Sequence, residues 1–474
     1  MTDAWIENRT FDDINVGDSA HMIRHLTRRD IELFAVVSGD INPAHLDETY
    51  ARTDRFHGII AHGLLSGAFI SAVLGTKLPG TGTIYLKQDL QFLKPVRPKD
   101  IIDVSVTVVH KDLTTKRIVF DCKCTNQDGQ DVVVGQAHVI APSEKIRRLA
   151  VELPDVEVYH HDRLRLLIEK AKLLPALRTA IVHPCDSVSL LGMDLAAREG
   201  LIIPVLVGPE ARIREAAEKA NISLAPYEII TAPHSHAAAL QAVQLVHEGK
   251  VDALMKGSLH TDELIGAGVD HDKGLRTDRR MSHVFVMDVP SYKWPLLITD
   301  AALNIAPSLM DKRDICQNAI DLAHDLGLEN PNVALLAATE EVQANMPATL
   351  DAAALCKMAE RGQITGGVLD GPLAFDNAIS AEAARIKGIQ SPLAGKADIL
   401  VVPTIEAGNM LAKQLDYLAA AESAGLVVGA KVPIILTSRA DHEHARLASA
   451  ALALLSVNGD KRRAKAKLCS KKDS

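Results

Sequence analysis

The spacing of apolar residues changes character once along the chain, between about residues 142 and 162. Before that interval, a helical pattern gives way to runs in which apolar and polar residues alternate, which is typical of strands with one buried face. After it, short continuous apolar runs alternate with helical stretches, which indicates buried strands in an α/β arrangement. The pattern therefore predicts at least two folding units, and a length of 474 residues agrees with this.

The first region, residues 10–142, predicts helices followed by an antiparallel sheet. Thr27 and Asp30 form a capping arrangement ahead of an apolar run, and Gly39 suits the exit of that helix. Residues 63–74 predict a second helix that is apolar almost all round, so we expect it to be buried. The predicted strands are 84–93, 101–110, 117–125 and 132–140. One long helix wrapped by such a sheet is an α+β domain.

The second region follows a polar interval of mixed charge, residues 143–161, which we interpret as a linker. Residues 162–460 predict an α/β domain, and its size favours a division into two lobes. We expect lobe 1 at about 162–290 plus 436–460, and lobe 2 at about 291–435. The predicted strands are 202–207, 253–255, 284–287, 296–298, 333–336, 367–369, 399–402 and 432–436.

Composition and charge exclude several classes of protein. The net charge of -8 argues against a nucleic-acid partner, and the basic residues within 461–474 are interpreted as a solvated tail. No apolar run approaches the roughly 20 residues needed to span a bilayer, and the N-terminus lacks the pattern of a signal peptide. The six cysteines have neither the spacing of zinc ligands nor that of the disulfide framework of a secreted protein. We expect Cys122 and Cys124 to be small buried hydrophobic residues. We expect a cytoplasmic protein.

The first candidate site is the pair Asp40 and His45, which lies where the predicted helix runs into a loop containing Pro43. A carboxylate and an imidazole five residues apart across a proline cannot share a helix face, but a loop can bring them together. Such a pair can activate a water molecule and later return a proton. The alternative is structural, because Gly-Asp-x-Asn-Pro is also a good helix stop and turn.

The run from Phe34 to His45 resembles the hydratase signature of the MaoC-like, R-specific enoyl-CoA hydratase family, and the resemblance covers roughly residues 10–142. It includes His62-Gly63 before the second helix and the Phe-Leu-Lys-Pro-Val run at 92–96. The resemblance implies a hot-dog fold. It also implies that Asp40 and His45 activate the water that adds to an enoyl-CoA, that Asn42 holds the loop, and that the Gly63 amide polarises the thioester carbonyl.

The second candidate site consists of four loops that follow predicted strands, at residues 256–261, 370–376, 403–409 and 436–441. The carboxyl ends of parallel strands are where ligand-binding groups gather. In the last loop, Arg439 begins a helix, where the helix dipole favours an anion rather than a cation. An arginine and free amides at a helix start are explained if an anion such as phosphate binds there.

Taken in this order, the four loops resemble the phosphate acetyl/butyryltransferase family over about residues 160–460, and their residues look closer to those of the butyryltransferase branch. The resemblance implies two α/β lobes related to isocitrate and isopropylmalate dehydrogenases, and direct acyl transfer between CoA and phosphate without a cofactor or metal. It implies that Ser438 stabilises the oxyanion and Arg439 holds phosphate. The substrate-binding candidates are Lys256, Gly257, Ser258, His260, Thr261, Asp370, Gly371, Pro372, Glu406, Gly408 and Asn409.

The resemblance leaves two roles open. The base that serves the CoA thiol is Asp441, with Glu443 as its rival, and a family arginine that is missing near Gly266 is replaced by Arg276, Arg279 or Arg280. Both families are usually oligomeric, so a homo-oligomer is expected, with acyl-CoA, enoyl-CoA and phosphate as small-molecule partners.

Three other interpretations of the sequence have less support. The second domain could be a non-catalytic acyl-CoA sensor attached to a hydratase, as in some malic enzymes, although Ser438 and Arg439 argue against this. A decarboxylating dehydrogenase is disfavoured because the dinucleotide-binding glycine pattern is absent from the sequence. The His-x-His pairs at 234–236 and 442–444 complete no known metal site, and Cys185 has no paired histidine that would mark a nucleophile.

Overall fold

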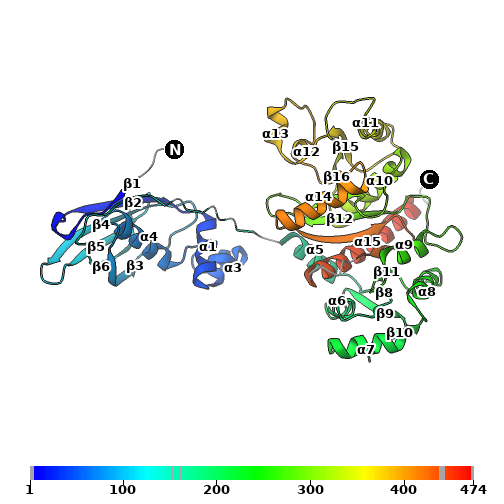
Figure 1. Cartoon of the computed structure of the whole chain (residues 1–474), viewed down its shortest axis with the longest axis horizontal. Helices are drawn as coiled ribbons and strands as arrows, with labels where there is room; N and C mark the ends of the chain where they lie inside the picture. The colour runs from blue at the N-terminus through cyan, green and yellow to red at the C-terminus, as the bar shows by residue number, and fades with distance from the viewer. Residues whose placement is uncertain are drawn as a thin grey trace. The chain divides into compact units, whose positions relative to one another are not determined.

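The computed structural model describes residues 5–151, 153–154, 156, 158–159, 162–436 and 443–470, with side chains up to residue 463. The chain divides into two compact units, Met1–Val158 and Tyr159–Ser474 (Figure 1). No helix within the described ranges has the length and apolar character that crossing a membrane requires.

The first unit is an antiparallel sheet packed against one face of helix α4 (Gly63–Thr76). The other face of that helix, which the sequence predicted to be buried, is exposed, and Leu64 on it is 64% exposed. The five strands have the order β2-β4-β5-β6-β3, and every neighbouring pair is antiparallel. The elements are β1 (Trp5–Glu7), β2 (Ser19–His25), α1 (Arg28–Ser38), α2 (Pro43–Leu46), α3 (Glu48–Thr53), α4 (Gly63–Thr76), β3 (Ile84–Phe92), β4 (Ile101–Asp112), β5 (Arg117–Thr125), β6 (Asp131–Ile140) and β7 (Arg147–Leu149).

Alternation along the strands builds the core of this unit. On β4 the buried side chains come at every second position from Ile102 to Val108, and on β5 Cys122 and Cys124 point into the same core. Helix α4 packs against this face through residues such as Phe69 and Ile70. The four predicted strands and the predicted helix at residues 63–74 are therefore confirmed, but β2 also joins this sheet and precedes α1, so the helices do not come before all of the strands.

The caps of α1 also follow the prediction. Thr27 and Asp30 form a reciprocal capping box, with a bond of 2.7 Å from the Thr27 amide to the Asp30 carboxylate. Gly39 ends the helix with a φ of 73°, a left-handed conformation that glycine adopts without strain. The predicted linker, by contrast, contains β7, which pairs with β1 in the first unit.

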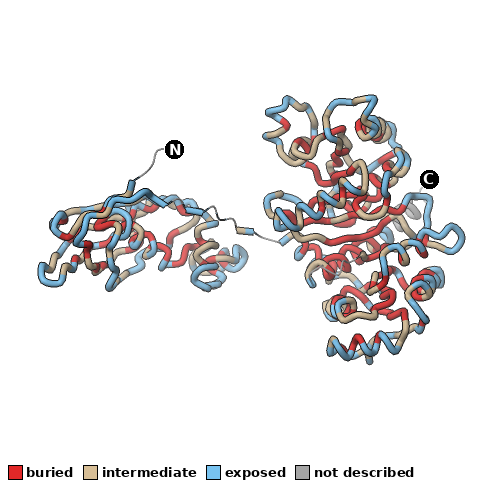
Figure 2. Tube along the Cα trace, viewed as in Figure 1, coloured by how far each residue is buried: buried red, intermediate tan, exposed pale blue. Residues whose placement is uncertain are grey.

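The second unit is built on one eleven-stranded sheet with the order β10-β9-β8-β11-β18-β17-β12-β13-β16-β14-β15. The strands are β8 (Leu177–Val182), β9 (Ile202–Gly208), β10 (Glu228–Thr231), β11 (Ala253–Lys256), β12 (Ser282–Asp288), β13 (Leu296–Thr299), β14 (Asn332–Leu336), β15 (Val368–Leu373), β16 (Ile399–Val401), β17 (Glu422–Val428) and β18 (Ile434–Ile435). Figure 2 shows buried backbone along the middle strands, with exposed segments around them.

Helices connect and cover these strands. They are α5 (Asp162–Lys172), α6 (Ser187–Arg198), α7 (Glu210–Ala220), α8 (Ser235–His247), α9 (Thr261–Val269), α10 (Leu309–Leu326), α11 (Pro347–Glu360), α12 (Phe375–Ile379), α13 (Ala381–Ile386), α14 (Ile405–Leu418) and α15 (Glu443–Ser470). Helix α15 packs against β17, α5 and α10.

The basic C-terminal segment does not begin as a solvated tail. Helix α15 continues through Lys461 and Arg463 to Ser470. The Arg463 guanidinium forms two hydrogen bonds to the Asp325 carboxylate, at 2.5 and 3.0 Å, and Asp325 is only 2% exposed. This ion pair fixes the helix at a position where the sequence pattern alone shows only a run of charges.

The strands of the second unit reverse direction in the middle of the sheet. Strands β8, β9, β10, β11 and β18 run parallel to one another, as do β13, β16, β14 and β15. Between these groups, β17 and β12 each pair antiparallel with both of their neighbours. The two parallel groups therefore run in opposite directions, and their carboxyl ends lie at opposite edges of the sheet.

Candidate active sites

A short loop brings Asp40 and His45 together in the first unit. The Asp40 carboxylate accepts a hydrogen bond from the Asn42 amide at 3.1 Å, which folds the chain directly after Gly39. The Asn42 side chain then caps α2 by accepting from the Ala44 amide at 3.1 Å. Because His45 lies on this helix, the Asn42 cap helps to fix the position of His45.

The orientation of His45 follows from one hydrogen bond. Its Nδ1 lies 2.9 Å from the carbonyl oxygen of Ile60, and a carbonyl can only accept, so Nδ1 carries the proton. Nε2 is then left with a lone pair that can take a proton from water. The histidine is buried, and its ring stacks on that of His62 with 3.8 Å between the centroids.

His62 connects the parts of this site and was given no role on the basis of sequence. Its Nε2 lies 3.0 Å from the carbonyl oxygen of Asp40, and burial lowers its pKa, so the ring is neutral and donates from Nε2. Its Nδ1 is buried and has no hydrogen-bond partner among the described residues. One ligand atom from each of Asp40, His45 and His62 lies within 4.8 Å of the other two. The His-Gly pair before the helix was the available sequence signal.

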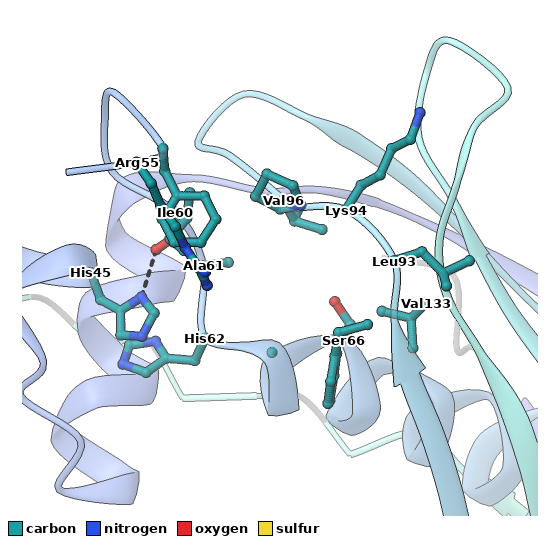
Figure 3. Close-up of a pocket in the computed structure, with 14 residues that line it drawn as sticks. His45, Arg55, Ile60, Ala61, His62, Ser66, Leu93, Lys94, Val96 and Val133 are labelled. Carbon is teal, nitrogen blue, oxygen red and sulfur yellow. Dashed lines mark hydrogen bonds between the residues drawn. The ribbon is translucent and has the colours of Figure 1, made fainter. Parts of the chain in front are cut away.

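A cavity of about 340 Å³ adjoins these groups. In Figure 3, His45 and His62 lie at one end, while Leu93 and Val133 lie toward the other. Its lining residues are His45, Arg55, Phe56, Ile60, Ala61, His62, Gly63, Ser66, Phe92, Leu93, Lys94, Pro95, Val96 and Val133.

The start of α4 gives this cavity a polar donor. Gly63 is the first residue of the helix, so its N–H has no partner within the helix. A Cβ at this position would lie 3.0 Å from a ring carbon of Phe92, so glycine leaves room for that ring beside the start of the helix. Arg55 and Lys94 add two cations to the lining; Lys94 lies in the run at 92–96 that carries the resemblance, but the sequence assigned a role to neither residue.

In the second unit, the loop after β11 meets the loop after the neighbouring strand β8. The Ser258 hydroxyl donates to the carbonyl of His183 at 2.8 Å and lies 3.1 Å from the Nδ1 of that histidine. The Cys185 amide donates to the same hydroxyl at 3.2 Å. Gly257 fits between the loops because a Cβ there would be 2.4 Å from the Val182 carbonyl. Two loops about 75 residues apart in sequence thus form one polar cluster.

His183 was missed because β8 itself was not predicted, although a His-Pro-Cys-Asp run follows its apolar residues. Burial lowers the pKa of His183 and raises that of the Cys185 thiol, so at neutral pH the histidine is uncharged and the thiol protonated. Thr261 is the first residue of α9, and His260 caps that helix, with its backbone amide donating to the carboxylate of Glu263 at 3.0 Å.

The loops after β15 and β16 lie at the opposite edge of the sheet from Lys256. Asp370, Gly371 and Pro372, which were expected in a loop, lie within β15, where the Asp370 carboxylate accepts from the Gly371 backbone amide at 2.9 Å. Beyond the loop after β16, Gly408 and Asn409 lie in α14, where Gly408 packs against Ala301 and the Asn409 side chain donates to the Ala301 carbonyl at 3.3 Å.

The helix that follows β16 has an exposed acid in its first turn. This acid is Glu406, and backbone and Thr404 hydrogen bonds lower its pKa. The strand ends therefore do not gather all of the predicted loops at one place.

Several predicted groups of the transferase site fall outside the described residues, namely Ser438, Arg439 and Asp441. The rival base, Glu443, is exposed at the first residue of α15.

Of the substitute arginines, Arg279 pairs with Asp321 at 2.5 Å, and Arg280 donates to the Asn304 side chain at 2.7 Å. Arg276 forms a β-bridge with Ala430. Arg280 lies at the amino end of β12, at the edge opposite the Ser258 loop.

Comparison with known proteins assigns both units to families. Residues 18–128 match the model of the MaoC like domain, and residues 234–454 match that of phosphate acetyl/butaryl transferase. The fold and the site therefore define a class of enzyme that combines a MaoC-like hydratase domain with a phosphate acyltransferase domain.

Individual relatives narrow this class. The second unit is 62% identical over 277 residues to a phosphate acetyltransferase of Rhizobium meliloti, a match that covers 58% of this chain and 88% of that protein. The chain thus belongs to the phosphate acetyl/butyryltransferase family, with the MaoC-like domain at its N-terminal side.

Two further relatives support the same family assignment. A phosphate butyryltransferase of Clostridium acetobutylicum is 41% identical over 62% of this chain and 98% of its own length. The crystal structure of a branched-chain phosphotransacylase from Enterococcus faecalis matches at 31% identity and a TM-score of 0.53, over 59% of this chain and 99% of that one. The expected closer likeness to butyryltransferases is not seen among these relatives, because identity to the acetyltransferase is higher.

Proposed function

We propose that the second unit transfers a short acyl group, acetyl or butyryl, from CoA to inorganic phosphate. The 62% identity to a phosphate acetyltransferase across 88% of that protein is the observation that supports this most directly. A phosphate oxygen attacks the thioester carbonyl carbon, the carbon–sulfur bond breaks, and the CoA thiolate leaves with a proton. No covalent enzyme intermediate, cofactor or metal takes part.

In this proposal, residues around the last strand carry the reaction. Ser438 donates to the oxyanion of the tetrahedral intermediate, Arg439 holds phosphate, and Asp441 or Glu443 exchanges the proton of the thiol. The polar cluster of His183 and Ser258 follows β8 and β11, and β11 pairs with β18, so it lies at the edge of the sheet where the segment after β18 begins.

The decisive experiment is a series of acyl-CoA substrates assayed for CoA release with and without phosphate. Arg439→Ala should abolish the phosphate-dependent release while the protein remains folded, and Arg214→Ala, which alters a surface ion pair with Glu210 on α7, should not. Phosphate-dependent turnover that survives the Arg439 substitution would exclude the assigned role. A unit that binds acyl-CoA without releasing CoA would instead be a sensor attached to a hydratase.

We further propose that the first unit hydrates short enoyl-CoA thioesters. The observation that carries this proposal is the position of His45 at the end of a 340 Å³ cavity, with its Nε2 available as an acceptor and Asp40 close to it. Asp40 and His45 remove a proton from water as its oxygen adds to the β-carbon, and that proton equivalent is returned to the α-carbon. The Gly63 amide stabilises the enolate oxygen.

This activity is tested by the loss of crotonyl-CoA absorbance. Asp40→Asn should lower the rate by at least about a hundredfold, which is the usual contribution of a general acid or base. A surface change such as Asp103→Asn, which removes the exposed partner of His21, should not. Full activity in Asp40→Asn would exclude the pair as the catalytic groups.

Three broader expectations remain proposals. A homo-oligomer is supported by β3, a nine-residue edge strand that exposes apolar side chains such as Ile84 and Leu86. The reversal of strand direction supports a two-lobed architecture like that of isocitrate dehydrogenase. A cytoplasmic location agrees with the free cysteines in the described part of the chain.

A further inference from the structure

Three metal-binding side chains converge beside the cavity of the first unit. One ligand atom from each of Asp40, His45 and His62 lies within 4.8 Å of the other two. Among the residues that the structure describes, no other group of three His, Cys, Asp or Glu side chains does so. The two histidine rings are already in contact, with 3.8 Å between their centroids and a tilt of 34°.

The hydrogen bonds of the two histidines are those of metal ligands. His45 donates from Nδ1 to the carbonyl of Ile60, and His62 donates from Nε2 to the carbonyl of Asp40. Each ring therefore keeps one nitrogen with a lone pair. A metal-bound histidine is oriented in the same way, by donating its other ring N–H to a carbonyl or carboxylate.

The lone pair of His62 gives a second, independent indication of a ligand. Nδ1 has no hydrogen-bond partner among the described residues, and the histidine is only 3% exposed. An unsatisfied buried acceptor is rare in folded proteins, and each one needs an explanation. A cation bound to Nδ1 would provide that explanation.

We propose that Asp40, His45 and His62 form a site for Zn²⁺, and that zinc bound there inhibits the hydratase. Two imidazole nitrogens and one carboxylate oxygen are a frequent zinc ligand set, with the fourth position open to water. Tetrahedral bonds of about 2.0–2.2 Å place ligand atoms roughly 3.4 Å apart, so the side chains need to close slightly on the ion. Asp40 is exposed and can turn toward it.

Inhibition follows because zinc and the proton of the reacting water would compete for the same lone pairs. Zinc would occupy the Nε2 lone pair of His45 and the carboxylate of Asp40, which are the groups that take the proton from water. This consequence depends on the proposed hydratase function, whereas the binding of zinc does not. Binding and inhibition therefore need separate measurements.

Binding is tested with the full-length protein after treatment with a chelator. Calorimetric titration with Zn²⁺ should give one site that weakens at least tenfold in Asp40→Asn and in His62→Ala, and Co²⁺ should give the visible spectrum of a tetrahedral site that both variants lose. The matched control is His21→Ala, because His21 and Asp103 form an exposed His–Asp pair in the same unit, 3.1 Å apart.

Circular dichroism establishes whether each variant is folded. If His62→Ala is not folded, the test rests on Asp40→Asn, whose side chain is nearly isosteric with that of the wild type. A zinc stoichiometry and affinity equal to those of the wild type in both folded variants would overturn the site.

Inhibition is tested in the same preparation. Hydration of crotonyl-CoA should fall in proportion to zinc occupancy and recover with EDTA, while phosphate-dependent CoA release is unchanged. Zinc that binds at the triad but leaves hydration unchanged would overturn the inhibition. If the metal-free protein hydrates no enoyl-CoA, the hydratase proposal fails, and the titration still decides whether the zinc site exists.

Discussion

His283 should make the second unit less stable in mild acid than at neutral pH. This histidine lies in the middle of the sheet on β12, is 2% exposed, and has a ring that meets Phe285 edge to face at 4.4 Å. Its Nδ1 is buried without a hydrogen-bond partner within the described part of the chain. Burial lowers its pKa from 6.5 to about 4, because the charged form has no water or counter-ion to stabilise it.

The direction of the effect follows from proton binding. Between pH 6.5 and pH 4 the unfolded chain protonates this histidine and the folded protein does not, so stability falls as the pH is lowered through that window. With these two pKa values, the free energy of unfolding decreases by about 2 kcal/mol between pH 7 and pH 5. Above pH 7 the contribution of His283 should be constant.

The assay compares wild type with His283→Leu, a buried apolar side chain of similar volume. The chain has two tryptophans, and with Trp5→Phe as background the fluorescence of Trp294 reports urea unfolding of the second unit alone. The difference in unfolding free energy between the two proteins should shift by about 2 kcal/mol in favour of His283→Leu on going from pH 7 to pH 5.

The control for this assay is His236→Leu, which removes an exposed histidine from α8. Its difference from wild type should not change in this way. A pH-independent difference between wild type and His283→Leu would refute the assignment of a neutral buried histidine.

Three further predictions concern single side chains. Gly63→Ala should lower the rate of enoyl-CoA hydration at least about tenfold without unfolding the unit, because the new Cβ would lie 3.0 Å from an aromatic ring carbon beside the proposed oxyanion donor; steady-state kinetics test this. Arg463→Ala should destabilise the second unit by about 3 kcal/mol in urea unfolding, because it leaves the Asp325 carboxylate buried without its partner. Lys94→Ala should raise the KM for enoyl-CoA several-fold with little change in kcat, because Lys94 lines the cavity and CoA is anionic, whereas Lys87→Ala, at a residue paired with Asp89, should change neither.

The elements of the first unit could mostly be predicted from the sequence, because the signals that mark them lie within each element or at its ends. Alternating apolar residues identify β4, β5 and β6, and the Thr27 box and Gly39 mark both ends of α1. Strand β2 was missed because it buries none of its residues fully, so Ser19–His25 carries no apolar stripe. The Asp40–His45 site could be predicted because the loop that joins the two residues is only a few residues long.

In the second unit, apolar runs indicated most strands but not their direction. A buried strand has the same apolar pattern whether it pairs parallel or antiparallel. The sequences of β17 and β12 therefore do not indicate that strand direction reverses at the centre of the sheet. The expectation that all of the loops gather at one edge assumed a single strand direction. Strands β8, β10 and β17 were missed for a simpler reason, since each is short or interrupted by polar residues or glycine.

The two sites therefore differ in how much a sequence can say about them. The groups of the first site come from a segment between Asp40 and Gly63, and their relative positions follow from helix caps and one stacked pair of rings. The polar cluster of the second unit joins His183 to Ser258, and this contact exists only because β8 and β11 are neighbours in the sheet. From a local motif, both the residues of a site and their geometry can be predicted. A cluster that depends on which strands are neighbours cannot be predicted until the strand order is known. Substitutions in the first site should accordingly act on chemistry, and those around His183 should also disturb the junction between two strands.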